Sequence, residues 1–527
     1  MKFLFFIIIF LSILTPILTY DFKCNLCKKI AIYGDKLLKN NHTITIIRDI
    51  LYPYCLYINA SGNCYGNRCK EICNDILNEY IPIVSEGLYD SMVDGSLCSS
   101  IKFCPPMYQK NITNIPLIYS NLNNYSGERK WDIWDNTSDI GYFIHLTDMH
   151  LDPQYNDGLP INCGLPICCR YKNNSNYSGP LSKYWGTPNV SCDIPPRLSE
   201  VLHKWFLNNM EPDFFINTGD DPPHNIWNQS KEFNTYVANL VASHHNISFN
   251  NIPGFVSIGN HEYFPVDMAK GNNEDDWLYN NMANTWKYWL NDDAVNTLKY
   301  GGYYTSRARP KLRIISLNTM LLVPDSIFSK DYAKGNWPDP LAQMAWFNNT
   351  LIQSYNRSEK VIVLAHHPFD DWDYRIRDVY TKIISKYNHI LLQLHGHSHM
   401  NEFFVMYSND IVKKPILTGI IGGSLSTTGI AKNNNMGCGF SGNPGFNVYY
   451  YNRTSLELLD LEYWWADINY ANIHNINPEW KMQYSAKNIY NMNNLTAKAW
   501  ELVDKQINNN STLKSIYYKI WSKGIVY

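Results

Sequence analysis

Short apolar runs that end in metal-binding side chains are the feature that most constrains this sequence. The clearest is the run at 390–394, which is followed closely by His397 and His399. Its length indicates a buried strand, and Gly396 allows a sharp turn where the strand ends. Two imidazoles two residues apart can reach different points of one polar pocket. The pattern is therefore suited to two neighbouring metal ions.

Four earlier segments repeat this pattern of an apolar run followed by carboxylate, amide or imidazole groups. They are Thr147–His150, Thr218–Asp221, Gly259–Glu262 and Ala365–Pro368. Between residues 140 and 460, the apolar runs alternate with polar and helical segments, at 142–146, 214–216, 255–258, 312–317, 361–364 and 390–394. This alternation predicts an α/β domain with buried strands, and sites in such domains lie beyond strand ends. We therefore expect all these segments to converge.

Each fragment alone is more often a solvated turn or a buried core histidine than a metal ligand. Their joint occurrence at strand ends makes a metal site the better interpretation. Oxygen donors mixed with imidazole nitrogens suit Zn²⁺, Mn²⁺ or Fe, and thiolates are absent from the pattern. Two cations close together need a bridging carboxylate, and Asp220, on a Gly-Asp turn, is the candidate.

The order Asp-x-His, Gly-Asp, Gly-Asn-His, His and Gly-His-x-His resembles the calcineurin-like metallophosphoesterases. The resemblance implies a β-sandwich flanked by helices, with hydroxide held between two cations attacking phosphorus in line. It also implies that the first metal is bound by Asp148, His150, Asp220 and His399, and the second by Asp220, Asn260, His366 and His397.

The departing alkoxide needs a proton, and two histidines are candidate donors. His261 follows Asn260, and His224 lies four residues after Asp220. The alternative for either is a hydrogen-bonding role that orients a ligand. Side chains alternate along a strand, so the remaining histidines are expected to pack away from the site: His145, His367 and His395.

The cysteines and the N-terminus indicate export from the cytosol. Thirteen cysteines, without paired C-x-x-C metal spacing, are too many for a cytosolic enzyme. Residues 1–20 resemble a secretory signal peptide, and no later run is long enough to cross a bilayer. We predict a secreted or lysosomal protein that is monomeric, since no heptads occur. A net charge of −2 suggests no nucleic-acid partner. Candidate glycosylation sites are Asn41, Asn111, Asn189, Asn228, Asn356, Asn452 and Asn494.

Residues 22–106 form a cysteine-dense segment with helical periodicity at 26–39, 45–57 and 74–90. The spacing of its outer cysteines resembles the saposin B-type domain, an all-α disulfide-rich unit, and implies the bridges Cys24–Cys104 and Cys27–Cys98. Cys55 would pair with Cys64, Cys69 or Cys73, and the sequence leaves this choice open. A metal site at Cys24 and Cys27 is the less favoured alternative. A linker rich in Pro and Asn follows at 107–139, and 461–527 is predicted to be a helical region that packs on the large domain.

A second cysteine group, Cys163, Cys168, Cys169 and Cys192, narrows the resemblance. Its spacing fits two loop disulfides, Cys163–Cys168 and Cys169–Cys192, and this segment, behind a saposin-type domain, resembles the acid sphingomyelinase family. The resemblance implies two Zn²⁺ ions and hydrolysis of sphingomyelin, in membranes or lipoproteins, to ceramide and phosphocholine; the helical front domain would contact the lipid. One alternative is a phosphodiesterase acting on nucleotides or other phospholipids. Another is a non-enzymatic lipid-binding protein. Unlike the family, this chain has only Cys438 after Cys192, as a free thiol or in an intermolecular bond.

Overall fold

The computed structural model describes parts of 45–56 and residues 70–82, 138–170, 178–271, 273–324, 339–428 and 442–523. Several predictions lie outside these residues: the signal peptide, the bridges Cys24–Cys104 and Cys27–Cys98, Cys438 and nearly all of the linker at 107–139.

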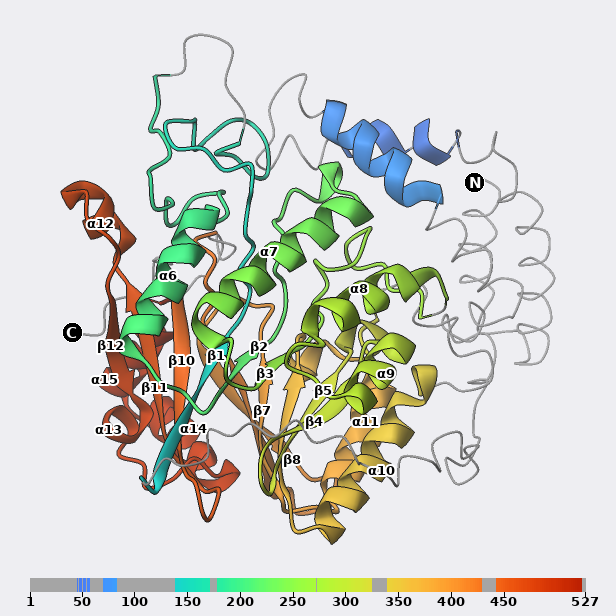
Figure 1. The fold of residues 1–527 in the computed structure, drawn as a ribbon, viewed down its shortest axis with the longest axis vertical. Helices are drawn as coiled ribbons and strands as arrows, with labels where there is room; N and C mark the ends of the chain where they lie inside the picture. Colours follow the sequence, from blue (N-terminus) through green and yellow to red (C-terminus); the bar gives the residue numbers. More distant parts are fainter. Residues whose placement is uncertain are drawn as a thin grey trace, which may run out of the picture.

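Two six-stranded β-sheets lie face to face at the centre of the molecule (Figure 1). Their strand orders are β12-β11-β10-β1-β2-β3 and β4-β5-β6-β7-β9-β8. The strands are β1 (Ile140–Leu146), β2 (Phe214–Asn217), β3 (Gly254–Val256), β4 (Tyr304–Arg309), β5 (Leu312–Leu317), β6 (Lys360–Ala365), β7 (Ile390–His395), β8 (Glu402–Tyr407), β9 (Pro415–Ile421), β10 (Gly445–Asn452), β11 (Leu458–Ala466) and β12 (Trp480–Ser485). β1, β2 and β3 are parallel, as are β5, β6, β7 and β9. Within each sheet, the carboxyl ends of these strands therefore lie at one edge.

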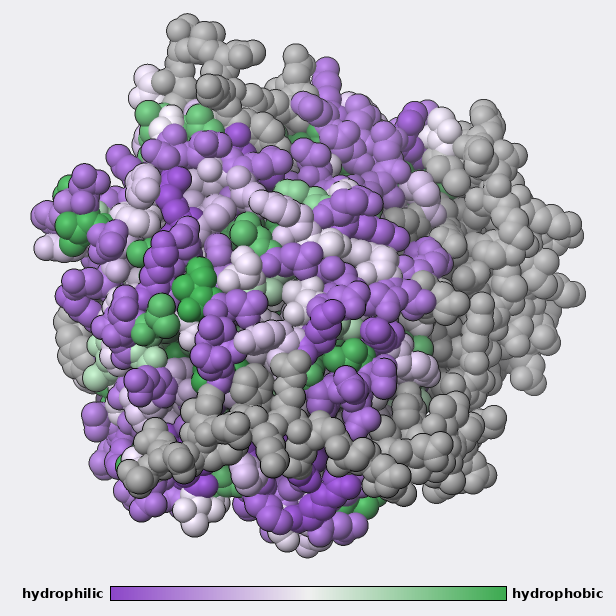
Figure 2. Space-filling view, in the orientation of Figure 1, coloured by the Kyte–Doolittle hydropathy of each residue, from purple (hydrophilic) through white to green (hydrophobic). Residues whose placement is uncertain are grey.

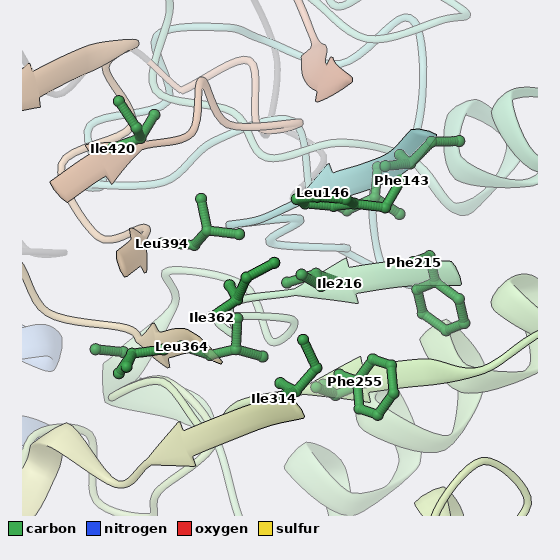
Figure 3. Close-up of a cluster of buried hydrophobic side chains, with 14 of the residues drawn as sticks. Phe143, Leu146, Phe215, Ile216, Phe255, Ile314, Ile362, Leu364, Leu394 and Ile420 are labelled. Carbon is green, nitrogen blue, oxygen red and sulfur yellow. The ribbon is translucent and has the colours of Figure 1, made fainter. Parts of the chain in front are cut away.

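Apolar side chains from both sheets meet in the space between them (Figure 3). Phe143 of β1 stacks on Phe214 and Tyr449, with ring centroids 4.6 and 4.8 Å apart. Ile314 and Ile362 of the second sheet are fully buried. Burial of each such side chain contributes about 1.5–3 kcal/mol. The core thus fixes the two sheets against each other.

Helices cover the outer faces of the sheets, which confirms the predicted β-sandwich flanked by helices. On the first sheet, Phe206 of α6 packs on Phe446 at 4.8 Å, and Phe249 of α7 stacks on Phe215 at 4.6 Å. α10 and α14 pack on strands of the second sheet. The helices are α6 (Pro196–Asn209), α7 (Lys231–Phe249), α8 (Asp276–Trp286), α9 (Asp292–Gly301), α10 (Gln343–Asn356), α11 (Tyr374–Ile384), α12 (Ile468–His474), α13 (Ala486–Tyr490), α14 (Ala497–Asn509) and α15 (Ser511–Trp521).

Residues 70–82 are helical, and the chain therefore turns helical four residues before the predicted segment at 74–90. Cys73 in this helix is bonded to Cys55, which was one of the pairings that the sequence left open. Ile72 is only 1% exposed and packs with Tyr155 and Trp227 of the large domain. This helix therefore contacts the loop that follows β1.

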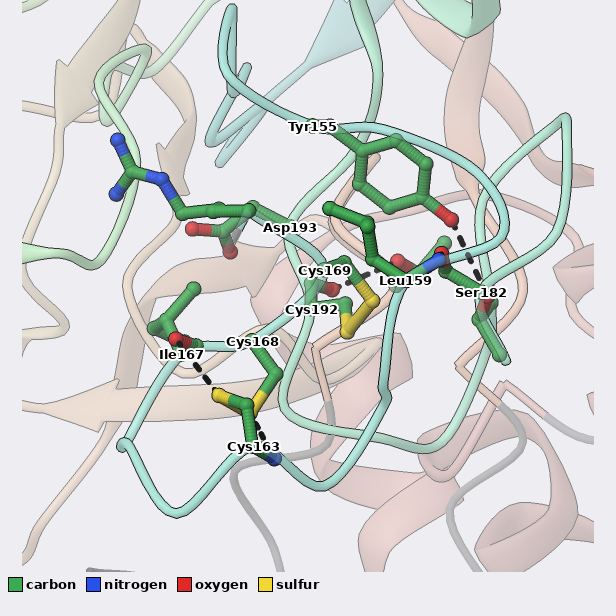
Figure 4. Close-up of a disulfide and its surroundings, with 12 residues drawn as sticks. Tyr155, Leu159, Cys163, Ile167, Cys168, Cys169, Ser182, Cys192 and Asp193 are labelled. Atoms are coloured by element: carbon green, nitrogen blue, oxygen red, sulfur yellow. Dashed lines mark hydrogen bonds between the residues drawn. A yellow bond between two sulfur atoms is a disulfide. The ribbon is translucent and has the colours of Figure 1, made fainter. Parts of the chain in front are cut away.

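The loop between β1 and α6 contains both disulfides predicted for it, Cys163–Cys168 and Cys169–Cys192 (Figure 4). Their sulfur atoms are buried together with Leu165 and Ile167. Cys192 is followed directly by Asp193, whose side chain is fully buried. The second bridge therefore fixes the chain next to a buried carboxylate.

The C-terminal region differs from the prediction. The expected boundary at residue 460 falls inside β11, and β12 extends the first sheet to Ser485. Helices α12 to α15 are present, so 461–527 is only partly helical. Aromatic residues such as Trp464 and Trp480 favour strands, and they occupy strand positions here.

Three predicted glycosylation sites are exposed, Asn189, Asn228 and Asn356, whereas Asn452 and Asn494 are half-buried. Asn41 and Asn111 lie outside the described residues. The face seen in Figure 2 is mainly hydrophilic, with scattered hydrophobic side chains. Within the described part of the chain, no helix is long and apolar enough to span a membrane.

Candidate metal centre

The predicted ligands converge where strands of the two sheets end. From the first sheet, Asp148 and His150 follow β1, Asp220 follows β2 and Asn260 follows β3. From the second sheet, the ligands follow β6 and β7: His366, His397 and His399. The backbone N–H of Gly396 donates to the carbonyl of His366 at 2.9 Å and joins these two strand ends. The site therefore lies across the junction of the sheets.

Five of these residues adopt a left-handed backbone conformation. Their φ angles are 47° for Asp148, 42° for His150, 64° for Asp220, 74° for His397 and 62° for His399. A non-glycine residue pays about 1–2 kcal/mol for this conformation. Such strain persists only where the surroundings impose it, and it concentrates at functional sites. The tight turns bring the side chains inward.

Gly396 serves a different purpose from the one predicted. Its backbone is not left-handed. A Cβ atom there would lie 2.7 Å from Oδ2 of Asp148 and would also clash with Thr147. Glycine is therefore required by the close approach of the β7 end to the β1 end, rather than by the turn itself.

The first group consists of Asp148, His150 and His399, which are all buried. Nε2 of His150 lies 2.9 Å from Nε2 of His399, and Oδ1 of Asp148 lies 3.5 Å from the latter atom. Nδ1 of His150 is 2.8 Å from the carbonyl oxygen of Pro222. That bond requires a proton on Nδ1, so Nε2 is left with its lone pair toward the group.

The second group consists of Asp220, His366 and His397, with Asn260 beside them. Nε2 of His366 lies 3.1 Å from Oδ2 of Asp220 and 3.0 Å from Oδ1 of Asn260. Nδ1 of His397 lies 3.2 Å from the same amide oxygen. Nδ1 of His366 is held by the carbonyl of Thr218 at 2.7 Å. Asp220 also reaches His150 at 3.7 Å and therefore stands between the groups.

The pKa values of these buried residues are shifted from their ordinary values. Burial raises the pKa of Asp148 to about 6, and nearby Asp220 adds to this rise. Burial lowers the pKa of His150 well below its ordinary value, as do neighbouring His224 and His261. In the second group, burial opposes ionisation of Asp220 and protonation of His366, but the attraction between the two outweighs burial, so the pKa of Asp220 is lowered and that of His366 is raised to about 10. Buried carboxylates among imidazoles thus gain from a positive charge beside them, which a metal cation would supply. The donor set fits two divalent cations.

His224 and His261 both face the first group. The ring centroid of His150 lies 3.7 Å from that of His224 and 4.7 Å from that of His261. Nδ1 of His224 donates to Asp193 at 2.7 Å. Burial alone would lower the pKa of His224, but Asp193 outweighs it and the pKa is raised. Burial lowers the pKa of His261 to about 4. Of these two histidines, only His224 has a raised pKa.

The histidines expected to pack away from the site do lie behind it. His145 bonds Thr218 at 3.0 Å, and Nδ1 of His395 lies 2.9 Å from the carbonyl oxygen of His367. Nδ1 of His367 contacts Thr319 at 2.9 Å, while its ring lies 4.3 Å from that of His397. His367 therefore supports a candidate ligand directly.

Sequence reasoning missed two carboxylates. Asp193 holds His224 and also accepts from Oγ1 of Thr428 at 2.7 Å. Its position next to a predicted disulfide was the available signal. Glu262 accepts backbone N–H bonds from Asp221 at 2.7 Å, Gly259 at 2.7 Å and Asp220 at 3.1 Å. Glu262 stands in the Gly-Asn-His-Glu segment, and it ties the β2 and β3 ends together.

Comparison with known proteins agrees with this geometry. Residues 141–401 match the model of the calcineurin-like phosphoesterase family. Sphingomyelin phosphodiesterase A of Dictyostelium discoideum is 29% identical over 94% of this chain and 84% of its own. Sphingomyelinase phosphodiesterase C of that organism is 32% identical over 68% and 79%. Bovine cyclic GMP-AMP phosphodiesterase SMPDL3A is 30% identical over 72% and 83%.

Proposed function

We infer that this chain, which belongs to the sphingomyelin phosphodiesterase family, is a metal-dependent phosphodiester hydrolase that cleaves sphingomyelin to ceramide and phosphocholine. The observation that carries the hydrolase assignment is the pair of ligand groups linked through Asp220, at strand ends of both sheets. The choice of sphingomyelin as substrate is supported by the sphingomyelin phosphodiesterase relatives. Two linked metal positions suit displacement at phosphorus, because both the attacking and the leaving oxygen need stabilisation.

We assign the metal positions as the sequence predicted them, and propose Zn²⁺ as the ion. Asp148, His150 and His399 would hold one ion with Asp220. Asp220, Asn260, His366 and His397 would hold the other. When bound, two such ions activate water and neutralise charge on the phosphoryl oxygens. Imidazole and carboxylate donors without thiolates suit zinc in a hydrolase.

The protein supplies the proton for the leaving ceramide oxygen. Asp193 engages Nδ1 of His224, so the opposite edge of the ring is left to carry the transferable proton. We assign His224 as the acid because its pKa is raised, chiefly by Asp193 against the opposing effect of burial. His261 has the lower pKa, about 4, and we assign it to hydrogen bonding with the phosphoryl group.

Sphingomyelin is a bilayer lipid, so we propose peripheral membrane contact through a saposin-type front domain at 22–106. The match to sphingomyelin phosphodiesterase A extends over 94% of the chain, well beyond the catalytic segment. The helix at 70–82 packs beside the disulfide loop that precedes Asp193. This contact supports a physical link between the front domain and the loop that carries Asp193. We also propose a secreted or lysosomal, monomeric and glycosylated protein.

A second candidate is hydrolysis of a nucleotide-type diester. It is favoured by the match to the cyclic GMP-AMP phosphodiesterase, which covers 83% of that protein. The ligand groups alone do not distinguish a choline-bearing headgroup from a nucleotide, because both substrates present the same phosphodiester.

The test is phosphocholine release from sphingomyelin liposomes at about pH 5, where an ordinary histidine of pKa ~6.5 is protonated. Cyclic GMP-AMP serves as the competing substrate, and each assay is run with and without a chelator. His224→Ala should abolish release, whereas His474→Ala, an exposed histidine on α12, should not. Cleavage of the nucleotide alone would establish the second candidate. Failure to cleave either diester would refute both candidate functions.

A further inference from the structure

The last turn within the described residues ends in a fully buried lysine. Lys523 follows α15 and is 0% exposed. Its Nζ donates to the hydroxyl of Ser424 at 2.8 Å and to the carbonyls of Ser424 and Ser426, both at 3.1 Å. A buried ammonium is rare unless oxygen acceptors surround it. These bonds account for its burial.

The backbone of Lys523 is also unusual. Its φ angle is 55°, and its N–H bonds the carbonyl of Ile520 at 3.0 Å, which closes the helix. Glycine or asparagine is favoured at such a position, and a lysine there carries strain. The side-chain hydrogen bonds of Lys523 therefore accompany a strained backbone at the same residue.

The segment that Lys523 holds, 424–428, braces the candidate centre. The N–H groups of Leu425 and Ser426 donate to the carbonyls of Thr147 and Asp148, at 3.1 and 3.0 Å. Thr428 donates its hydroxyl to Asp193 at 2.7 Å. One short loop therefore supports both the first ligand turn and the carboxylate that holds His224.

The same helix end reaches the other ligand turn. Nε1 of Trp521 donates to Oε2 of Glu402 at 3.1 Å, and the other oxygen of Glu402 accepts from the hydroxyl of Ser398 at 3.0 Å. Ser398 lies between His397 and His399. The end of α15 thus contacts supports on both sides of the centre, although the sequence predicted only packing for this region.

We propose that Lys523 is a positioning residue: its ammonium fixes segment 424–428, and thereby sets the Asp148 turn and the Asp193–His224 pair for metal binding and proton transfer. This inference rests on the proposed metal centre. Burial lowers the pKa of Lys523 to about 7, with Asp148 acting in the opposite direction, so the amine is cationic in acid conditions.

The test replaces Lys523 with methionine, which keeps most of the length and removes the charge. Zn²⁺ affinity is measured by competition with a fluorescent chelator, and kcat and KM with bis(4-nitrophenyl) phosphate. Substitution of residues that orient metal ligands typically costs 10–100-fold, so Lys523→Met should weaken Zn²⁺ binding and lower kcat by about that factor, with KM nearly unchanged. The matched control is Lys519→Met, an exposed lysine of the same helix.

A gentler variant guards against loss of folding. Ser424→Ala removes one acceptor and should weaken Zn²⁺ binding in the same direction, by roughly 2–10-fold. The double variant should bind zinc no worse than Lys523→Met alone, because both act through one contact. Unchanged zinc affinity and kcat in Lys523→Met, or additive effects in the double variant, would overturn the proposal. A wild-type protein that binds no zinc would instead refute the zinc centre on which this proposal rests.

Discussion

Replacing Asp193 with asparagine would separate the charge of this residue from its size. Its carboxylate accepts three bonds: from Nδ1 and the backbone N–H of His224, and from the hydroxyl of Thr428, each at 2.7 Å. A hydrogen bond to a charged group is worth about 1.5–3 kcal/mol. If only the bond to Nδ1 is lost, kcat should fall by a factor of roughly 10 to 150, from 1.36 kcal/mol per tenfold.

The same change has a predictable pH signature. The pKa of His224 is raised above its ordinary 6.5, since Asp193 outweighs burial, so its contribution to stability is full below pH 6.5 and is lost as the pH rises through the folded value. The pKa of Asp193 is lowered from 3.8, since His224 outweighs burial, so its contribution is lost as the pH falls below that range. The wild type should therefore exceed the variant most in stability between these ordinary values.

Thermal melting at a series of pH values, together with the pH profile of kcat, measures both effects. The descending limb of the profile should shift to lower pH in Asp193→Asn, because His224 loses its charged partner. Asp378→Asn, which removes a surface partner of Lys382, should change neither. A variant whose stability deficit is the same at every pH, with an unshifted profile, would refute the role given to this pair.

Three further predictions concern supports at increasing distance from the candidate metal centre. Glu262→Gln places an amide N–H₂ donor where backbone N–H groups now find an acceptor, and each bond lost should lower the free energy of unfolding by about 1–3 kcal/mol. Calorimetry should show a lower melting temperature, and equilibrium dialysis should show weaker metal binding. Conversion of Cys169 and Cys192 to serine opens a loop with a sequence separation of 23 and should cost about 2–5 kcal/mol in urea unfolding; an unchanged midpoint would contradict this. Phe143→Ala leaves a cavity between the sheets at about 3–5 kcal/mol, measurable by the same unfolding, while KM should stay near the wild-type value in the folded fraction.

The strand ends could be predicted because each is marked in the sequence by an apolar run followed by polar residues. Each apolar run is buried on both faces, so it appears as an uninterrupted hydrophobic segment, and the polar residues that follow stand out. His397 and His399 could be placed in one site from their spacing alone. The prediction that Asp220 lies between the two groups rests on family resemblance as well as on its Gly-Asp turn.

The supports were not predictable, because their partners are distant in sequence. Lys523 meets Ser424 across 99 residues, and Thr428 meets Asp193 across 235. A lysine after a helix is typical of an exposed helix end. Only the folded structure shows that Lys523 is buried. The end of β11 and all of β12 lie in the region predicted to be helical, although large aromatic residues such as Trp464 and Trp480 favour strands.

Because the candidate ligands come from both sheets, the complete ligand set is present only after most of the chain has been synthesised. The donors of the first sheet leave the ribosome early, whereas His399 contacts His150 from 249 residues later. At about 5–20 residues per second, that interval is roughly 12 to 50 s. A nascent chain therefore displays half a binding site well before the other half is made, and Lys523 arrives later still. We therefore expect metal to bind after synthesis of the chain, in the compartment where the polypeptide completes its folding.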